Sequence, residues 1–212
     1  CADVAAYSRM VEKDEAAAVG RVKAAFDQVF VPKVASHGGR VIKFMGDGAL
    51  VEFTSAVDAV ACAIALQDHY AGLDLDRPED ARIRFRIGVN LGDVIVQGDD
   101  IMGEGVNIAA RLQALAQPGG VVLSRNVCEQ VAGKVSAAFE DMGEVAVKNI
   151  ERPVHVFALK GLDASYGAGT FNRNTGAFVV TLGALPDVGS SLVLTWNVPT
   201  QETQQPSTTL KA

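Results

Sequence analysis

One carboxylate stands at the tip of a predicted β-hairpin. Two apolar runs, residues 41–45 and 49–53, flank the triplet Gly46-Asp47-Gly48, and this pattern predicts two strands joined by a tight turn. Asp-Gly is among the commonest hairpin turns, so the hairpin alone favours a structural role for Asp47. Polar residues in other stretches of the chain argue for a chemical role instead. One of them is Asp3, in the short apolar stretch of residues 2–7, which we expect to be the end of a strand.

A predicted helix carries two of these polar side chains. Asn107 and Arg111 lie four residues apart within residues 103–116, and side chains at this spacing share one face of a helix. A surface pair on an amphipathic helix is the simpler interpretation. The apolar residues around the pair nevertheless leave little room for an arbitrary polar face.

The elements that must position these side chains form a mixed α and β pattern. Asp14 can cap a helix over residues 14–36, and the capping box Ser55-Ala-Val-Asp58 opens a second helix that runs to about Tyr70. Residues 82–90 alternate between apolar and polar side chains, which is typical of a half-buried strand.

Shorter elements complete the plan. They are a strand at 94–97 after a turn at Gly92-Asp93, a strand at 121–123, a helix at 126–131 and two strands within 139–157. The order β-α-β-β-α-β predicts an α+β fold of the ferredoxin-like type, with helices on one side of an antiparallel sheet.

The composition changes after Lys160, which divides the chain into two predicted parts. Residues 1–160 form the main domain. Residues 161–212 are rich in Gly, Thr, Ser and Val and nearly free of charge, which predicts a small β-rich appendage. Within it we expect a hairpin of residues 170–171 and 177–182, a strand at 191–198, and a flexible end.

The overall composition excludes several classes of protein. The 212 residues carry a net charge of −6 and a pI of about 5.1, so no basic footprint for nucleic acid is expected. No apolar run approaches the roughly 20 residues of a membrane helix. The three cysteines lie far apart without a CxxC pair, which favours reduced thiols and a cytoplasmic location.

Four ordered blocks resemble a known enzyme family. They are ADVAAYSRM, GGRVIKFMGDGALVEF, FRIGVNLGDVIVQGDDIMGEGVNIAARLQ and GEVAVKNIERPVHVF. Together they resemble the class III nucleotidyl cyclase catalytic domain, most closely its bacterial adenylate cyclase branch, over about residues 2–159. The first strand is shorter than the family's, Ala6 stands where the family usually has glycine, and residues 163–212 have no counterpart in these cyclases.

The resemblance implies conversion of ATP to cyclic AMP and pyrophosphate with two Mg²⁺ or Mn²⁺ ions. Asp3 and Asp47 match the family's metal ligands, as suits hard cations that prefer carboxylate oxygens. Lys43 and Asp100 match its adenine-selecting pair, because a lysine can donate to adenine N1 and an aspartate can accept from N6. Without the resemblance, Lys43 would be read as an exposed strand residue and Asp100 as a loop residue.

Three further residues match family positions that hold the rest of the nucleotide. Asn107 matches the ribose-positioning asparagine, and Arg111 matches the arginine that stabilises the transition state. Lys148 matches, more loosely, a lysine on the terminal phosphates. In the family the metal aspartates come from one subunit and the base-selecting, asparagine and arginine residues from the other, so the resemblance implies a homodimer with composite sites.

Two other functions are compatible with these residues. The chain could be a non-catalytic nucleotide-binding or dimerisation module of the same fold. It could also be a guanylate cyclase, although guanine reverses the hydrogen-bonding pattern that Lys43 and Asp100 would read. We expect ATP as the substrate and neither nucleic acid nor a membrane as a partner.

Overall fold

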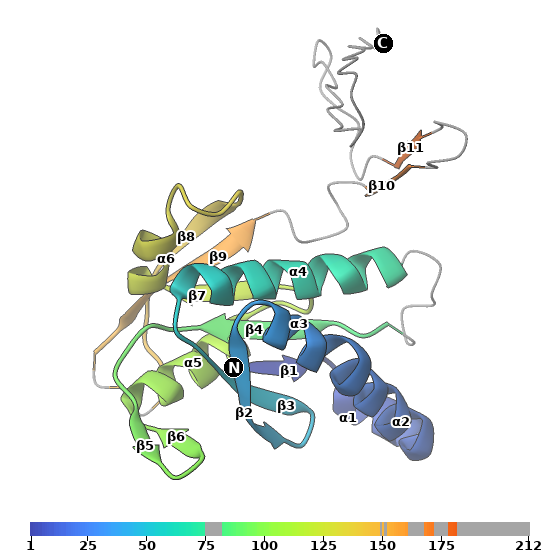
Figure 1. The fold of residues 1–212 in the computed structure, drawn as a ribbon, viewed down its shortest axis with the longest axis horizontal. Coiled ribbons are helices and arrows are strands. Elements are labelled where there is room, and N and C mark those ends of the chain that lie inside the picture. Colours follow the sequence, from blue (N-terminus) through green and yellow to red (C-terminus); the bar gives the residue numbers. More distant parts are fainter. Residues whose placement is uncertain (75–81, 149, 151, 161–167, 172–177, 182–212) are drawn as a thin grey trace, which may run out of the picture. The chain divides into compact units, whose positions relative to one another are not determined.

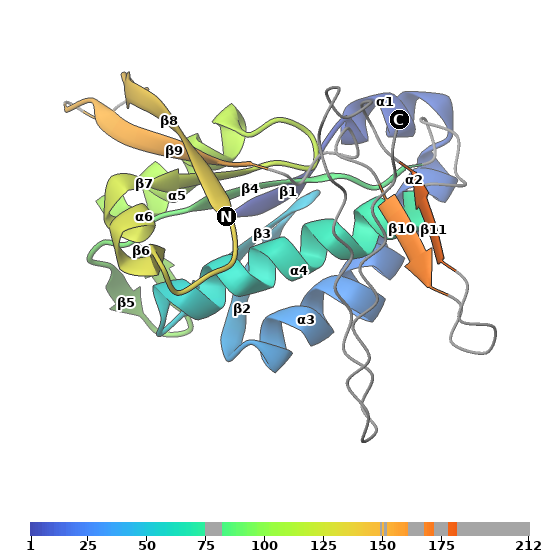
Figure 2. The ribbon, with the colours of Figure 1, turned by 90° about the horizontal axis from the view of Figure 1, so that it is seen from above.

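The structure is a computed structural model, and it describes residues 1–74, 82–148, 150, 152–160, 168–171 and 178–181. The chain divides into two compact units, Cys1–Ala164 and Ser165–Ala212. A seven-stranded sheet with helices on both faces makes up the first unit (Figures 1 and 2). Among the described helices, none combines the length and the apolar composition that crossing a bilayer requires.

The sheet has the strand order β2-β3-β1-β4-β7-β9-β8. Every neighbouring pair is antiparallel except β4 and β7, which run parallel. The predicted α+β class with an antiparallel-dominated sheet is therefore confirmed. The strands are β1 Ala2–Val4, β2 Gly39–Met45, β3 Gly48–Phe53, β4 Phe85–Val89, β7 Val121–Ser124, β8 Ala138–Val145 and β9 Val154–Lys160.

Most of the helices cover one face of this sheet and share one core with it. Their buried side chains, such as Val22, Phe30 and Leu66, pack with Val4, Phe85 and other strand residues. The helices on this face are α1 Tyr7–Lys13, α2 Glu15–Ala25, the π-helical η1 Phe26–Phe30, α3 Val31–Ser36, α4 Ala56–Asp74 and α6 Arg125–Val131.

One helix packs on the opposite face, so the expectation that all helices lie on one side is wrong. Helix α5, Glu104–Leu115, buries Leu112 against Val122 and Val156 in a second, smaller core. Side chains alternate along a strand, so Val122 faces α5 while its neighbours Val121 and Leu123 face the larger core. A single buried strand thus serves two helical layers.

The helical run before the hairpin follows its predicted capping. The side chain of Asp14 accepts a hydrogen bond of 3.0 Å from the amide of Ala17, as an N-cap does. The run continues to Ser36 through the π turn, in which Val31 donates to the carbonyl of Phe26. Pro32 follows directly, and its missing N–H removes one ordinary helical hydrogen bond.

The chain differs from the prediction just after β1. The apolar residues 2–7 suggested a strand end, but β1 stops at Val4 and α1 begins at Tyr7. Ala6 makes the corner with φ of 59° and ψ of 22°, the left-handed conformation that L residues other than glycine seldom adopt.

A separate hairpin follows β4. The predicted strand at 94–97 is present as β5 Ile95–Gln97, but it pairs with β6 Asp100–Met102 and not with β4. Asp100, expected in a loop, therefore begins a strand. The second compact unit contains β10 Ala168–Phe171 and β11 Phe178–Thr181, an antiparallel pair at the position of the expected hairpin. The expected turn between them, the strand at 191–198 and the flexible end lie outside the described residues.

Candidate active site

Strand β1 places the first aspartate in the middle of the sheet. Asp3 lies opposite Gly48 of β3 on one side and Arg86 of β4 on the other. The Arg86 guanidinium donates two hydrogen bonds to the Asp3 carboxylate, from Nε to Oδ1 at 2.9 Å and from Nη2 to Oδ2 at 2.5 Å. This bidentate pairing fixes both side chains more firmly than a single contact would.

The second aspartate lies next to this pair. Asp47 forms the turn between β2 and β3, and its carbonyl accepts a 3.0 Å hydrogen bond from the amide of Val4. The hydrogen bonds to Asp3 raise the pKa of Arg86, and the charges of Asp3 and Asp47 raise it further. We call Asp3, Asp47 and Arg86 the carboxylate cluster.

Arg86 is a candidate site residue that the sequence did not reveal. Its alternation with apolar neighbours placed it only on the polar side of a strand. Its pairing with Asp3, 83 residues away in sequence, depends on the register between β1 and β4. The available signal was the polar face of the strand predicted at residues 82–90.

The two carboxylates of the cluster suit magnesium or manganese only as part of a coordination shell that other ligands complete. Among the residues that the structure describes, no group of three or more His, Cys, Asp or Glu side chains could hold a metal ion. Mg²⁺ is typically bound through one or two carboxylates, with water and substrate phosphate oxygens as the remaining ligands. Two neighbouring aspartates match that mode and do not match a closed all-protein site.

Lys43 and Asp100 come together across two strands. Lys43 Nζ donates to Asp100 Oδ2 at 2.6 Å, which ties β2 to β6. The hydrogen bond from Lys43 holds the pKa of Asp100 below its ordinary value, assisted by a hydrogen bond from the Ile101 amide. Both side chains are 40% exposed, so a ligand can reach this donor and acceptor.

Helix α5 presents the predicted polar pair to solvent. Asn107 is exposed and Arg111 is half-buried, and neither side chain has a hydrogen bond or ion pair within the part of the chain that the structure describes. The helix can approach β4 closely because Gly88 has no side chain: a Cβ there would collide with the backbone of Ala109 and Gln113. We call Asn107 and Arg111 the α5 face.

Lys148 lies apart from these groups. It is exposed in a turn that follows β8, and no interaction within the described ranges ties it to another candidate residue.

Several candidate side chains nevertheless share one face of the sheet. Ala2 and Val4 point into the larger core, so Asp3 between them points to the α5 side. Phe44 packs on Phe26 of the larger core at 5.1 Å between ring centroids, so Lys43 also points to the α5 side. The carboxylate cluster and the Lys43–Asp100 pair therefore open on the face that α5 only partly covers.

The candidate residues described above fall within the match to one protein family. The family model described as "Adenylate and Guanylate cyclase catalytic domain" matches residues 2–161. The chain belongs to the adenylate and guanylate cyclase catalytic domain family. The family predicted from the sequence motifs is confirmed, and all of the candidate residues above lie within the matched cyclase domain.

Known cyclases resemble this domain in sequence and in structure. A Rhizobium meliloti (strain 1021) protein named "Putative adenylate cyclase 3" is 51% identical over 156 residues, which are 74% of this chain and 27% of that protein. A crystal structure titled "Adenylate/Guanylate Cyclase/Hydrolase" from Silicibacter pomeroyi is 39% identical with a TM-score of 0.71, and the match covers 74% of this chain and 92% of that one.

A more distant structure agrees in fold. The adenylyl cyclase CyaB from P. aeruginosa is 22% identical with a TM-score of 0.61, and the match covers 76% of this chain and 91% of that chain. The chain spans about a quarter of the length of the Rhizobium relative.

Proposed function

We propose that this cyclase domain converts ATP to 3′,5′-cyclic AMP and pyrophosphate. The observation that carries the proposal is the Lys43–Asp100 pair, an accessible donor beside an accessible acceptor. The name of the Rhizobium relative, which refers to an adenylate cyclase, supports the same substrate.

The base is read by this pair. Adenine presents an acceptor at N1 and a donor at N6, so it complements a lysine donor and an aspartate acceptor. Lys43 donates to N1 and Asp100 accepts from N6, and the two side chains exchange their mutual ion pair for contacts with the base. Guanine presents the reverse pattern and would leave both groups unmatched, which disfavours the guanylate cyclase alternative.

Asp3 and Asp47 would hold two Mg²⁺ or Mn²⁺ ions together with the phosphates of ATP. Bound there, the ions would activate the 3′ hydroxyl and offset the charge of the triphosphate. Arg86 now neutralises Asp3. A cation bound to Asp3 would free the Arg86 guanidinium to donate to phosphate oxygens. The planar arrangement of its N–H donors suits that role.

The remaining groups hold the ribose and the transition state. Asn107 positions the ribose so that the 3′ oxygen is in line with the α-phosphorus. Arg111 donates to the phosphate oxygens on which charge builds during the reaction. Lys148 contacts the terminal phosphates.

The active form in this proposal is a homodimer with composite sites. The α5 face and the Lys43–Asp100 pair of one copy complete the carboxylate cluster of the other. The surface around Lys43 and Asp100 supports such an association, because it carries large exposed apolar side chains. They are Met45 at the end of β2, and Ile95, Val96 and Met102 of the β5–β6 hairpin, with exposures of 40% to 65%.

The test is nucleotide turnover with Mn²⁺, measured separately with ATP and with GTP. We expect cyclic AMP from ATP and much slower product formation from GTP. Asp47→Asn keeps the size of the side chain but removes its charge. It should lower turnover by about 10³-fold or more, because the metal ions lose a carboxylate ligand. Asp68→Asn, an exposed change on α4, is the matched control and should leave turnover unchanged.

Three results would contradict parts of the proposal. Cyclisation that survives in Asp47→Asn would exclude the assigned metal ligand. A preference for GTP would favour a guanylate cyclase. A folded dimer that binds ATP but releases no pyrophosphate would favour a non-catalytic nucleotide-binding module.

A further inference from the structure

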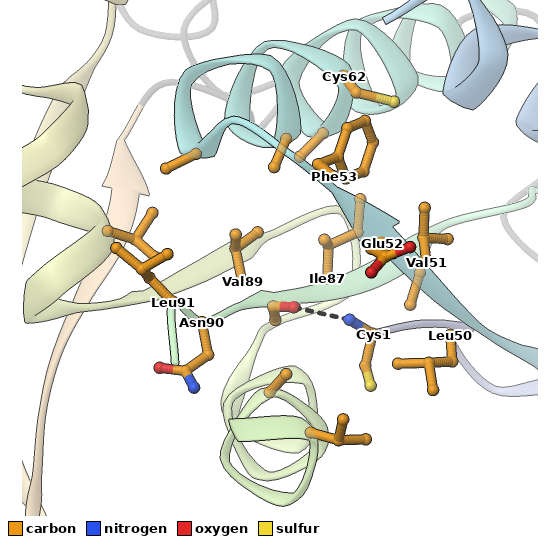
Figure 3. A pocket seen from close by; sticks show the side chains of 18 of the residues that line it. Cys1, Leu50, Val51, Glu52, Phe53, Cys62, Ile87, Val89, Asn90 and Leu91 are labelled. Atoms are coloured by element: carbon orange, nitrogen blue, oxygen red, sulfur yellow. Dashed lines mark hydrogen bonds between the residues drawn. The ribbon is translucent and has the colours of Figure 1, made fainter. Parts of the chain in front are cut away.

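One side chain ties the start of helix α5 to the end of strand β4. Asn90, the first residue after β4, donates a 3.0 Å hydrogen bond from Nδ2 to the carbonyl of Gly105. Ile87 and Val89 pack on the larger core, so Gly88 and Asn90 face the α5 side of the sheet. Figure 3 shows the Asn90 side chain pointing away from the side on which Val89 lies. The hydrogen bond therefore joins the sheet to the first turn of the helix.

Strand and helix meet at two points with matching spacing. Gly88 lies so close to α5 that a Cβ there would collide with the carbonyl of Ala109, and Asn90 meets Gly105. Two residues of a strand span about 6.6 Å and four residues of a helix about 6.0 Å, so both contacts fit one antiparallel alignment of β4 and α5. The Gly88 contact holds the middle of the helix, and the Asn90 hydrogen bond holds its start.

The start of α5 has little else to hold it. Its N-cap is Gly103, which makes no side-chain capping hydrogen bond. A Cβ on Gly105 would lie 2.9 Å from the carbonyl oxygen of Asp93, so the absence of a side chain lets this turn approach the segment after β4. Within the described residues, the half-buried Asn90 supplies the side-chain hydrogen bond to this turn.

We propose that Asn90 is a positioning residue that sets the place of Asn107 for catalysis. Asn107 follows Gly105 by two residues, about 200° around the helix, so it projects from the side opposite β4. A shift of the helix start would therefore carry Asn107 with it. This inference rests on the proposed function, in which Asn107 orients the ribose.

The two residues of the α5 face should depend on Asn90 to different extents. Asn107 lies in the first turn, next to the carbonyl that Asn90 binds. Arg111 lies beyond the point where the helix rests on Gly88, and that contact remains when the hydrogen bond is lost. Loss of the hydrogen bond should therefore displace Asn107 more than Arg111.

The test compares kcat for ATP with Mn²⁺ in single and double variants. Asn90→Ala should lower kcat by roughly 10-fold and change the KM for ATP by less than about threefold, because a displacement of about 1 Å at a reacting group can cost about 100-fold in rate. Added to Asn107→Ala, the same change should cost less than about twofold, because the group that it positions is already absent. Added to Arg111→Ala, it should again cost roughly 10-fold.

Tyr70→Phe is the control for a loss of stability alone. It removes a 3.2 Å hydrogen bond from the Tyr70 hydroxyl to the carbonyl of Ala25 in the larger core, on the other face of the sheet from α5, and should leave kcat unchanged. An unchanged kcat in Asn90→Ala would overturn the proposal. An equal loss in the parent, Asn107→Ala and Arg111→Ala backgrounds would overturn it as well.

Amide hydrogen exchange separates this proposal from the proposed function. In Asn90→Ala, exchange at Ile108 and Ala109 near the start of α5 should become about tenfold faster or more, while exchange at Leu123 in β7 should not change. A parent that forms no cyclic AMP would contradict the proposed function and not the role of Asn90 in holding α5. Unchanged exchange at Ile108 and Ala109 would overturn that role whether or not the parent is active.

Discussion

The carboxylate cluster and the α5 face lie in one domain, but the arginine of the first is paired with a carboxylate and the arginine of the second is not. In the carboxylate cluster, Arg86 binds Asp3 through two hydrogen bonds, and both residues belong to central strands. On the α5 face, Arg111 and Asn107 have no side-chain partner within the described residues and project from a helix surface. Asp3 and Arg86 satisfy each other within the chain, while the α5 face has donors available for an external group.

This contrast indicates how the two groups would be used. Ligands must compete with Arg86 for Asp3, so binding at the carboxylate cluster involves an exchange of partners. Binding at the α5 face involves no such exchange. The Lys43–Asp100 pair is intermediate, since it is paired but 40% exposed. Four experiments test these differences, beginning with the largest expected effect.

The strongest test separates the two regions onto different copies of the chain. Asp47→Asn should inactivate the carboxylate cluster, and Arg111→Ala should lower kcat by about 10²- to 10³-fold because a transition-state donor is lost. In a composite homodimer, mixing the two inactive variants creates one site with both regions intact. We therefore expect the mixture to recover up to a quarter of the parent's turnover, measured as cyclic AMP formed per chain, about the random-pairing estimate for a dimer.

The control for this test is each variant measured alone at the same total protein concentration. Neither variant alone should show the recovered turnover. If the mixed sample also stays inactive while both variants form dimers, the carboxylate cluster and the α5 face do not complete each other across an interface.

A second variant tests the paired but accessible Lys43. Lys43→Gln replaces the charged donor with a neutral amide that can also accept, so the preference for ATP over GTP should fall by roughly 10-fold, about the cost of one hydrogen bond to a charged group. The measurement is the ratio of kcat/KM for the two nucleotides. Arg40→Gln removes a charge from the same strand at the Glu52 pair and should leave the ratio unchanged.

A third variant tests whether Arg86 competes with cations. Arg86→Gln frees the Asp3 carboxylate from its bidentate partner, so Mn²⁺ should bind several-fold more tightly in the absence of nucleotide, while turnover of ATP should fall. Calorimetric titration with Mn²⁺ alone reports the affinity. Arg84→Gln removes an equal charge two residues earlier without freeing Asp3, and an equal gain in this control would exclude competition by Arg86.

The smallest expected effect concerns the corner that links the carboxylate cluster to α1. Ala6 adopts a left-handed conformation that costs an L residue about 1–2 kcal/mol, and glycine avoids this cost but loses more entropy on folding. Ala6→Gly should therefore stabilise the domain by about 0.5–1 kcal/mol in denaturant titration. Ala5→Gly, at a buried neighbour without this conformation, should destabilise it. A loss of stability in Ala6→Gly would show that the corner is not strained.

Local features of the fold were predictable because their causes lie close together in sequence. Asp14 caps the helix that follows it, and Ser55 accepts from the amide of Asp58 at 3.2 Å as the capping box predicted. The hairpin around Asp47 forms with its turn at the expected residues. The roles of Asp3, Asp47, Lys43, Asp100, Asn107, Arg111 and Lys148 in catalysis stay predictions.

Other features could not be read from local patterns. The π turn at Phe26–Phe30 and the left-handed Ala6 carry no distinctive composition. Strand β5 was predicted, but its partner strand was not. It pairs with β6, and that choice depends on which strand offers it the more favourable backbone hydrogen bonds. Sequence patterns describe a segment's own preferences and say little about which distant segment it will meet.

The amino-acid sequence by itself determined the family, the α+β class and the types of side chain available for chemistry, because those depend on motifs and on local hydrophobic periodicity. Only the tertiary structure decided that Arg86 binds Asp3, that Lys43 meets Asp100, and that α5 packs on the second face of the sheet. Each of these results joins segments through strand register or sheet-face alternation. Register is set by the packing of the whole core, which no single stretch of sequence contains.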